Sequence, residues 1–289
     1  MSKPSQIYRL LFVVGILIVV NFYLIHLDWQ AQNKGLTLAM LDVGQGDAIY
    51  VESPTGTQIM FDAGPQNKII GSLARVMSPF DKSIDAIVIT NPDADHIGGF
   101  REILENYEVS QAFEAGTFNA SKTYHNLEAE IREKNIPNFL LKKGMRLDIG
   151  GGAYIDILFP DRDVSTYSSN DGSVVARLVY GETSVVLTGD ATSETEKIVS
   201  DQFSPDQLNS TILKVAHHGS KTSSLSQFVE AVSPEYALIS NGKDNKYGHP
   251  HRETLDTLEE FGARVFRTDL LGTIIMRSDG QNETFSFIK

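Results

Sequence analysis

At residues 90–99 the chain reads Thr90-Asn91-Pro92-Asp93-Ala94-Asp95-His96-Ile97-Gly98-Gly99, and this stretch decides how the rest is interpreted. It follows a continuous apolar run, Ile84 to Thr90, which is typical of a buried strand. It leads into residues 97–107, which are predicted to be helical. Carboxylates and an imidazole therefore meet in one strand-to-helix loop, and these are ligands that suit zinc or manganese. Helix capping by the aspartates is the alternative.

The sequence outside this stretch repeats one pattern. A strand, a tight turn and a second strand are predicted twice, at 47–52 and 57–62, and again at 174–180 and 184–187. Both hairpins end on an aspartate beside a glycine, Asp62 in the first and Asp190 in the second. Helices and strands follow each hairpin. We therefore predict two related halves, packed sheet against sheet with helices outside and with their strand-end loops along one edge.

Two further segments with histidines follow the second hairpin. The first, Val215-Ala216-His217-His218-Gly219-Ser220-Lys221, ends an apolar strand on paired histidines. The second, Asn245-Lys246-Tyr247-Gly248-His249-Pro250-His251, holds His249 extended because proline follows it. Both segments are candidates for ligand or catalytic side chains. A solvated loop in the first and a helix cap at His251 in the second are the alternatives.

The composition narrows the possible chemistry. The 289 residues include no cysteine, which excludes disulfides, thiolate metal sites and a cysteine nucleophile. The net charge is −12, so general attraction to nucleic acid phosphates is excluded as the main binding force. Any phosphate substrate must therefore be held by metal ions or by a local patch of charge.

The N-terminal segment 7–27 is mainly apolar and has the length of a membrane-spanning helix. Basic residues lie at its start and Asp28 follows it, so the positive-inside rule predicts a cytoplasmic N-terminus. We predict a single-pass protein of the cell membrane with two parts. Residues 1–33 are a cytoplasmic stub and transmembrane anchor, and residues 34–289 are an extracytoplasmic domain. A signal peptide cleaved near Ala31 is the alternative.

Taken in order, the motifs of this chain resemble those of the metallo-β-lactamase superfamily. More narrowly, the sequence from Leu36 to Ile288 resembles the C-terminal hydrolase domain of ComEC-like competence proteins. The motifs that carry the resemblance are Leu41-Asp42-Val43-Gly44-Gln45-Gly46-Asp47, Asp62-Ala63-Gly64, the 90–99 stretch, Thr188-Gly189-Asp190, the paired histidines and Tyr247-Gly248-His249-Pro250-His251. The resemblance implies an α/β fold of the αββα sandwich type and a metal-dependent hydrolase that acts on ester or phosphodiester bonds.

The resemblance also implies which residues hold one or two divalent ions, zinc and/or manganese. The implied ligands of the first ion are Asp95, His96, His217 and, as a bridge to the second ion, Asp190. The implied ligands of the second ion are Asn91, Asp93 and either Asn170 or Asp171. The residues that would orient these ligands from behind are Asp62 and His218.

Three residues are implied in catalysis. Asp95 would orient or deprotonate the attacking water. His249 would donate to the substrate or the leaving group, and Lys221 would pair with a phosphate.

The chain departs from the superfamily's usual motif, His-x-His-x-Asp-His. The two leading histidines are Asn91 and Asp93 in this sequence, and the histidine expected before Thr188-Gly189-Asp190 is also absent. One site keeps two histidines and two carboxylates, whereas the other has only Asn and Asp oxygens and is weaker for zinc. The departures predict a mononuclear enzyme, or one with manganese in the weaker site.

We therefore predict a membrane-anchored, metal-dependent hydrolase of phosphodiester bonds, DNA among them, with a link to competence. Nucleic acid or another phosphodiester is the predicted partner, together with the membrane, and the sequence indicates no protein partner. Two alternatives remain open. One is a non-catalytic metal-binding or assembly module, which the lost histidine motivates. The other is a hydrolase of a small ester or lactone.

Overall fold

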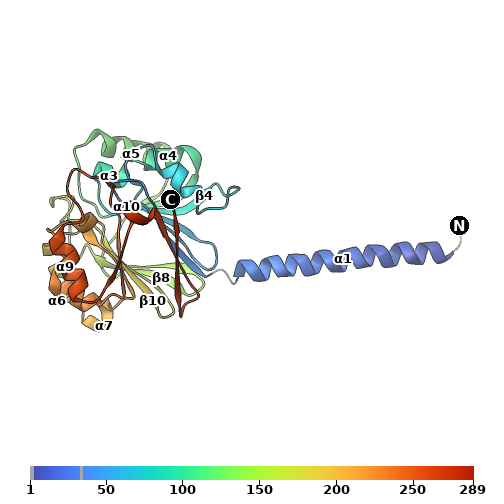
Figure 1. The fold of residues 1–289 in the computed structure, drawn as a ribbon. Helices are drawn as coiled ribbons and strands as arrows, with labels where there is room; N and C mark the ends of the chain where they lie inside the picture. Colours follow the sequence, from blue (N-terminus) through green and yellow to red (C-terminus); the bar gives the residue numbers. More distant parts are fainter. Residues whose placement is uncertain (1–2, 33–34) are drawn as a thin grey trace.

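The computed structural model describes the backbone of residues 3–32 and 35–289, and the side chains of residues 8–23 and 35–289. From residue 35 onward, two β-sheets lie face to face and helices cover their outer faces (Figure 1). This layering confirms the αββα sandwich.

Within the described residues, eight strands form the first sheet and seven form the second. In their order across the sheet, the strands of the first are β15 (Glu283–Ile288), β14 (Thr273–Ser278), β1 (Leu36–Met40), β2 (Ile49–Glu52), β3 (Gln58–Phe61), β4 (Ser83–Ile89), β5 (Glu108–Glu114) and β6 (Asn138–Leu140). Those of the second are β13 (Arg264–Arg267), β12 (Tyr236–Ile239), β11 (Ile212–Lys214), β10 (Thr183–Leu187), β9 (Val175–Tyr180), β8 (Ala153–Phe159) and β7 (Arg146–Gly150).

The two sheets repeat one arrangement of strands. In the first sheet, the antiparallel hairpin β2–β3 is followed by β4, β5 and β6, each parallel to the strand before it. In the second sheet, the hairpin β9–β10 is followed by β11, β12 and β13 in the same way. The predicted duplication is confirmed. Because parallel strands end at the same edge of a sheet, the loops that follow them open together.

Helices pack on the outer face of each sheet. Those of the first half are α2 (Ile69–Leu73), α3 (Ala94–Ile97), α4 (Phe100–Asn106) and α5 (Lys122–Glu133). Those of the second half are α6 (Ser193–Gln202), α7 (Pro205–Leu208), α8 (Ser226–Val232) and α9 (Arg252–Glu260). Two short elements lie in loops, the 3₁₀ turn η1 (Ala216–Gly219) and α10 (Thr268–Leu271).

Apolar side chains form two separate clusters. Along β1, Leu38 and Met40 belong to the cluster that both sheets share, whereas Ala39 belongs to the cluster beneath the helices of the first half. This alternation has the period of two that a strand imposes. Phe228 of α8 extends the shared cluster to the helices of the second half. The two clusters pack against both faces of the first sheet and so fix the positions at which its strands end.

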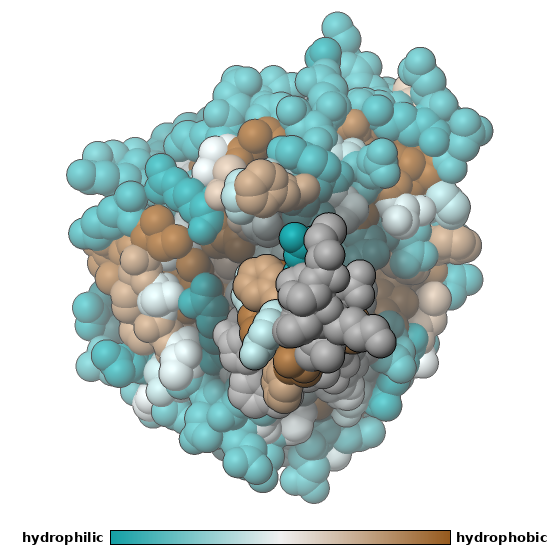
Figure 2. Space-filling model, turned by 90° about the vertical axis from the view of Figure 1, so that its right-hand side faces the viewer, coloured by the Kyte–Doolittle hydropathy of each residue, from teal (hydrophilic) through white to brown (hydrophobic). Residues whose placement is uncertain are grey.

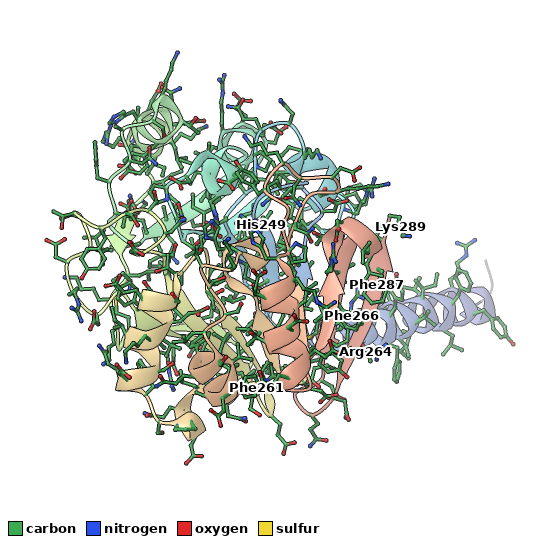
Figure 3. The ribbon with its side chains drawn as sticks, turned by 60° about the vertical axis from the view of Figure 1, so that its left-hand side comes forward. His249, Phe261, Arg264, Phe266, Phe287 and Lys289 are labelled. Carbon is green, nitrogen blue, oxygen red and sulfur yellow. The ribbon has the colours of Figure 1, made fainter. Side chains whose placement is uncertain are left out.

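The two sheets also meet at one edge, where β13 and β15 lie side by side. The ring centroid of Phe266 is 5.0 Å from that of Phe285 and 5.4 Å from that of Phe287 (Figure 3). The sequence pattern predicts neither β15 nor β5, because both strands carry many polar and partly exposed residues. Both strands form because they pair with neighbouring strands, although their own residues do not show a clear strand pattern.

Helix α1 (Lys3–Gln32) extends away from the sandwich in Figure 1. Its described large side chains, among them Leu10, Phe12 and Phe22, are exposed. The prediction of a transmembrane helix over residues 7–27 is not supported, since within the described residues no helix is long and apolar enough to cross a membrane. Residues 7 and 24–27 lie outside the described side chains. The face of the domain seen along α1 is mainly hydrophilic (Figure 2).

Candidate metal centre

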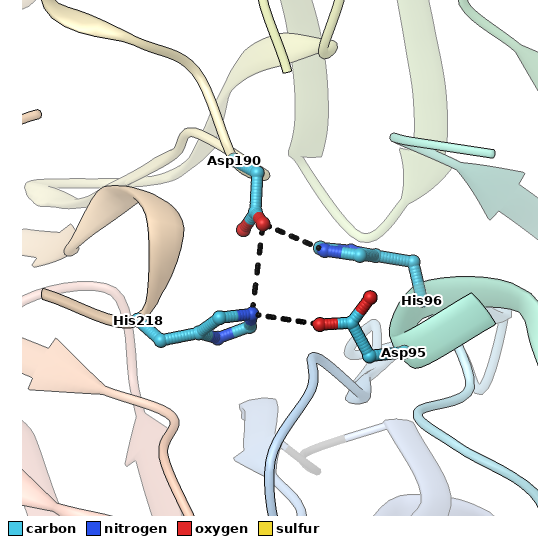
Figure 4. Close-up of side chains that lie close together, drawn as sticks. All are labelled: Asp95, His96, Asp190 and His218. Carbon is cyan, nitrogen blue, oxygen red and sulfur yellow. Dashed lines mark ion pairs between the residues drawn. The ribbon is translucent and has the colours of Figure 1, made fainter. Parts of the chain in front are cut away.

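Four side chains meet where strands of both sheets end. Asp95 and His96 lie on α3, directly after β4, and Asp190 follows β10. His218 lies in η1, directly after β11. One ligand atom from each of the four lies within 4.8 Å of the others (Figure 4). The two sheets therefore build a cluster of carboxylate and imidazole groups, as the positions of the motifs at strand ends predict.

The contacts inside this cluster are close. His96 Nε2 lies 3.1 Å from Asp190 Oδ2, and His218 Nε2 lies 3.4 Å from Asp95 Oδ2 and 3.6 Å from Asp190 Oδ2. His96, Asp190 and His218 are buried, whereas the side chain of Asp95 is 36% exposed. Solvent therefore reaches the cluster on the side of Asp95.

Asp62, which follows β3, holds His96 from behind. Its Oδ2 atom lies 2.8 Å from His96 Nδ1, and its Oδ1 atom accepts a hydrogen bond of 2.8 Å from Thr90 N. Hydrogen bonding at Nδ1 directs the other ring nitrogen, Nε2, into the cluster. This is the position that the sequence assigns to Asp62.

His218 takes the place that the sequence assigns to His217. The Nδ1 atom of His218 is 3.0 Å from the carbonyl oxygen of Ser240, so its Nε2 faces the cluster. His217 is 23% exposed, its Nδ1 is 3.2 Å from Thr222 Oγ1, and its Nε2 is 3.9 Å from Asp190 Oδ2. Both histidines have left-handed φ angles, 50° and 56°.

The buried carboxylates draw positive charge to this point. Burial alone would lower the pKa of His96, but Asp190 and Asp62 outweigh it and hold that pKa well above its usual range. Burial likewise opposes a charge on His218, yet Asp190 and Asp47 raise its pKa to about 10. Burial alone would raise the pKa of Asp190, but His218 and His96 hold it well below its usual range. A divalent cation would supply the charge that protons otherwise bring.

Unbonded atoms in the cluster also fit a metal ion. Within the described residues, His218 Nε2 and Asp190 Oδ1 are buried and have no hydrogen-bond partner. Buried polar atoms are rarely left in this state, because their loss of hydration is uncompensated. Two imidazole nitrogens and two carboxylates are a donor set that suits zinc or manganese. The residues present therefore fit one divalent ion.

Asp47 and Lys214 are part of the site although the sequence assigned them no role. Their side chains, 2% and 1% exposed, form a buried ion pair, and Lys214 Nζ also donates to the carbonyl oxygen of Gly189 at 2.6 Å. Asp47 Oδ1 lies 3.4 Å from His218 Nδ1. The signal for Lys214 was a lysine inside an otherwise apolar strand, and the signal for Asp47 was its motif, Leu41 to Asp47.

The residues assigned to a second ion also lie together, but they bond to one another. Asn91 Nδ2 donates to Asn170 Oδ1 at 2.8 Å, and Asn91 Oδ1 accepts from Asp93 N at 2.8 Å. Asp93 Oδ1 accepts from Asn119 Nδ2 at 2.7 Å and from Ser169 Oγ at 2.8 Å. The Asn91 oxygen therefore already accepts one hydrogen bond within the turn.

The remaining predicted residues lie outside the four-residue cluster. Asp171 accepts hydrogen bonds from Ser168 and Thr192, at 2.6 and 2.7 Å. Lys221 is exposed, and its backbone N–H donates to His251 Nδ1 at 3.1 Å. His249 lies at the junction of the two halves (Figure 3), with its ring 6.4 Å from that of His218.

A family model described as the metallo-beta-lactamase superfamily matches residues 41–243, which is most of the chain. The chain belongs to the metallo-beta-lactamase superfamily.

Its relatives in the superfamily include competence proteins. The chain is 32% identical to ComE operon protein 3 of Bacillus subtilis over 264 residues, covering 86% of this chain and 34% of that protein. It is 28% identical to competence protein ComA of Neisseria gonorrhoeae over 237 residues, covering 81% of this chain and 31% of that protein. The resemblance to ComEC-like competence proteins is confirmed. The chain spans about a third of the length of these relatives.

A solved structure agrees with the fold. The metallo-beta-lactamase fold protein YhfI of Bacillus subtilis aligns with a TM-score of 0.55 at 11% identity, covering 87% of this chain and 100% of that chain.

Proposed function

We propose that this chain is a metal-dependent hydrolase in which Asp95, His96, Asp190 and His218 hold one divalent ion. The observation that supports it best is a pair of buried, unbonded atoms, His218 Nε2 and Asp190 Oδ1, beside the partly exposed carboxylate of Asp95. Inward-facing ligand atoms with one side open to solvent are what a catalytic metal site needs.

The chain's own residues divide the work of hydrolysis. A bound divalent ion supplies a Lewis acid that polarises the scissile group and lowers the pKa of a water molecule. With the ion bound, Asp95 would accept a proton from an attacking water molecule, because it is the ligand that solvent reaches. Burial alone would raise the pKa of Asp95, but His218 and His96 hold it below its usual range, so the carboxylate is ionised. Asp62 keeps His96 oriented throughout.

His249 acts as a neutral side chain in this scheme. Burial, followed by the charges of His218 and His217, lowers the pKa of His249 to about 4. At neutral pH its ring can donate one N–H hydrogen bond to a substrate oxygen, but it does not carry the extra proton of an imidazolium. His249 is therefore proposed to donate a hydrogen bond to the substrate and not to transfer a proton to it.

Phosphodiesters, DNA among them, are the proposed substrates. One relative is named a competence protein, and this supports nucleic acid as the substrate class for the present chain. The net charge of −12 argues against long duplex DNA and favours a short or single-stranded segment. The activity of the relatives as whole proteins does not carry over, because the chain spans about a third of them.

Attachment to a membrane through residues 7–27, with residues 34–289 on the extracytoplasmic side, stays a proposal from the sequence. It rests on the apolar stretch and the charges that flank it. Protease added to intact spheroplasts should digest the domain, and protection until lysis would contradict this orientation.

Metal removal and return test the proposed function. The purified chain, stripped with a chelator, should cleave neither bis(para-nitrophenyl) phosphate nor single-stranded DNA. Titration with manganese or zinc should restore cleavage fully at one equivalent, because the four ligand atoms that lie within 4.8 Å of one another form one site.

The possible outcomes separate the alternatives. Metal binding without cleavage of either phosphodiester would contradict the proposal and favour the non-catalytic module. Cleavage of para-nitrophenyl acetate alone would favour the small-ester hydrolase. Full activity only at two equivalents would leave the hydrolase standing and contradict the single ion.

A further inference from the structure

An exposed tyrosine lies beside the metal centre on the loop after β12. The side chain of Tyr247 is 52% exposed. Its ring stacks on that of His249, with centroids 5.6 Å apart and an interplanar angle of 24°. Lys246 Nζ lies over the same ring, 5.0 Å from its centroid. His249 therefore supports the aromatic platform of the Tyr247 ring, and an arriving base would displace the Lys246 ammonium from it.

The loop that carries Tyr247 is fixed by the side chain of Asn245. Asn245 Nδ2 donates to the carbonyl oxygens of Gly242 and His249 at 2.9 and 2.7 Å. Asn245 Oδ1 accepts from the backbone N–H groups of Tyr247 and His249 at 3.2 and 3.0 Å. Four hydrogen bonds from one side chain hold the platform in place before any ligand arrives, which lowers the entropy that binding must overcome.

The ring of His249 lies between Tyr247 and the proposed metal ligands. His249, on which Tyr247 stacks, has its ring centroid 5.7 Å from that of His217 and 6.4 Å from that of His218. The loop is also fastened to η1, because His251 N donates to the carbonyl oxygen of Gly219 at 2.9 Å. A group that lies on Tyr247 is therefore adjacent to a group held at the cluster.

The charge around the platform is opposite to that of the whole chain. The segments 217–225 and 241–251 contain three lysines and one aspartate, Lys221, Lys243, Lys246 and Asp244. All four lie exposed. On a chain with a net charge of −12, this is a local patch able to attract phosphate.

We propose that Tyr247 is a stacking platform for a base of single-stranded nucleic acid whose adjoining phosphodiester lies at the metal centre. In this arrangement the Lys246 ammonium leaves the Tyr247 ring to pair with one flanking backbone phosphate, and the exposed Lys221 pairs with another. Aromatic rings bind unpaired bases without regard to sequence, and a duplex cannot offer such a base without unpairing. This inference rests on the proposed function and adds the form of the substrate.

Kinetics on two matched substrates test the platform. One is a short oligothymidylate, and the other is an oligomer of the same length with abasic sugars, which keeps the phosphodiesters and lacks the bases. In the full, metal-loaded chain, Tyr247→Ala should raise KM for the oligothymidylate roughly ten-fold, the effect of losing one stacked base. KM for the abasic oligomer and kcat for both should stay unchanged.

Three variants serve as comparisons. Tyr247→Phe should behave like the wild type, because stacking does not need the hydroxyl group. Lys246→Met should raise KM for both oligomers, more strongly at low salt than at high salt. Tyr154→Ala is the matched control, since Tyr154 also lies under a cation, with Arg146 Cζ 3.8 Å from its ring centroid, but on β8 at the other end of the second sheet.

The outcomes distinguish failure of the platform from failure of the proposed hydrolase function. Cleavage of neither oligomer by the wild type would overturn the proposed function. Cleavage of both, with KM for the oligothymidylate unchanged in Tyr247→Ala, would overturn the platform alone. A fall in kcat on the abasic oligomer in Tyr247→Ala would also overturn it, because the tyrosine would then act on the site rather than on a base.

Discussion

Lys214→Met is expected to lower the free energy of unfolding by about 3–5 kcal/mol, the usual effect of removing one partner from a buried ion pair. Lys214 and Asp47 are 1% and 2% exposed, and their charged groups are in contact. Without the ammonium group, Asp47 stays buried beside Asp62, and the His218 ring, 3.4 Å from its Oδ1, offsets only part of its charge. Denaturant unfolding in the presence of a chelator measures this effect free of any metal contribution.

Two further variants show whether charge is the cause. The double variant Lys214→Met with Asp47→Asn should recover much of the lost stability, because no buried charge is then left unpaired. Lys197→Met should have a far smaller effect, since Lys197 and Asp201 form an ion pair at 2.7 Å with side chains 58% and 50% exposed. Wild-type stability in Lys214→Met would show that the buried pair does not hold this part of the site.

His218→Ala is expected to weaken metal binding by more than about 100-fold and to abolish hydrolysis. The Nε2 atom of His218 faces Asp95 and Asp190 at 3.4 and 3.6 Å, so the substitution removes a ligand itself. Loss of a residue that only orients a ligand typically lowers affinity about 10–100-fold, and Asp62→Asn should fall in that range. Titration of the stripped protein with manganese or zinc, followed by calorimetry, measures both.

His217→Ala provides the matched neighbour. Its ring is 23% exposed and its Nε2 is 3.9 Å from Asp190 Oδ2, so we expect its affinity for metal to change less than that of Asp62→Asn. The opposite ranking, with metal lost in His217→Ala and retained in His218→Ala, would restore the assignment that the sequence motif suggested.

Much of the fold follows from local pattern. Two similar sheets are predicted by the hairpins that end at Asp62 and Asp190 and by the buried strand before the 90–99 stretch. These signals can be recognised in the sequence because the alternation of apolar and polar residues, and the choice of turn residues, depend only on near neighbours. The meeting of loops at one edge follows from parallel strands. Asp95, His96 and Asp190 were therefore predicted to converge. The exposed edge strand β15 was not, because its order comes from β14 rather than from its own residues.

The finer assignments at the site needed the tertiary structure. His217 and His218 are adjacent in sequence, and only the burial and contacts of their rings show which one turns inward. From the sequence, Asn91 is a candidate metal ligand. In the structure its side-chain oxygen accepts a hydrogen bond from Asp93 N. Asp47 and Lys214 are far apart in the chain and meet only when the two sheets pack. The sequence by itself determined the sandwich fold and the types of side chain that gather at its strand ends, because residue type and spacing carry both. The direction of each side chain and the partner of each buried charge were decided by the tertiary structure, because they depend on dihedral angles and packing between distant segments.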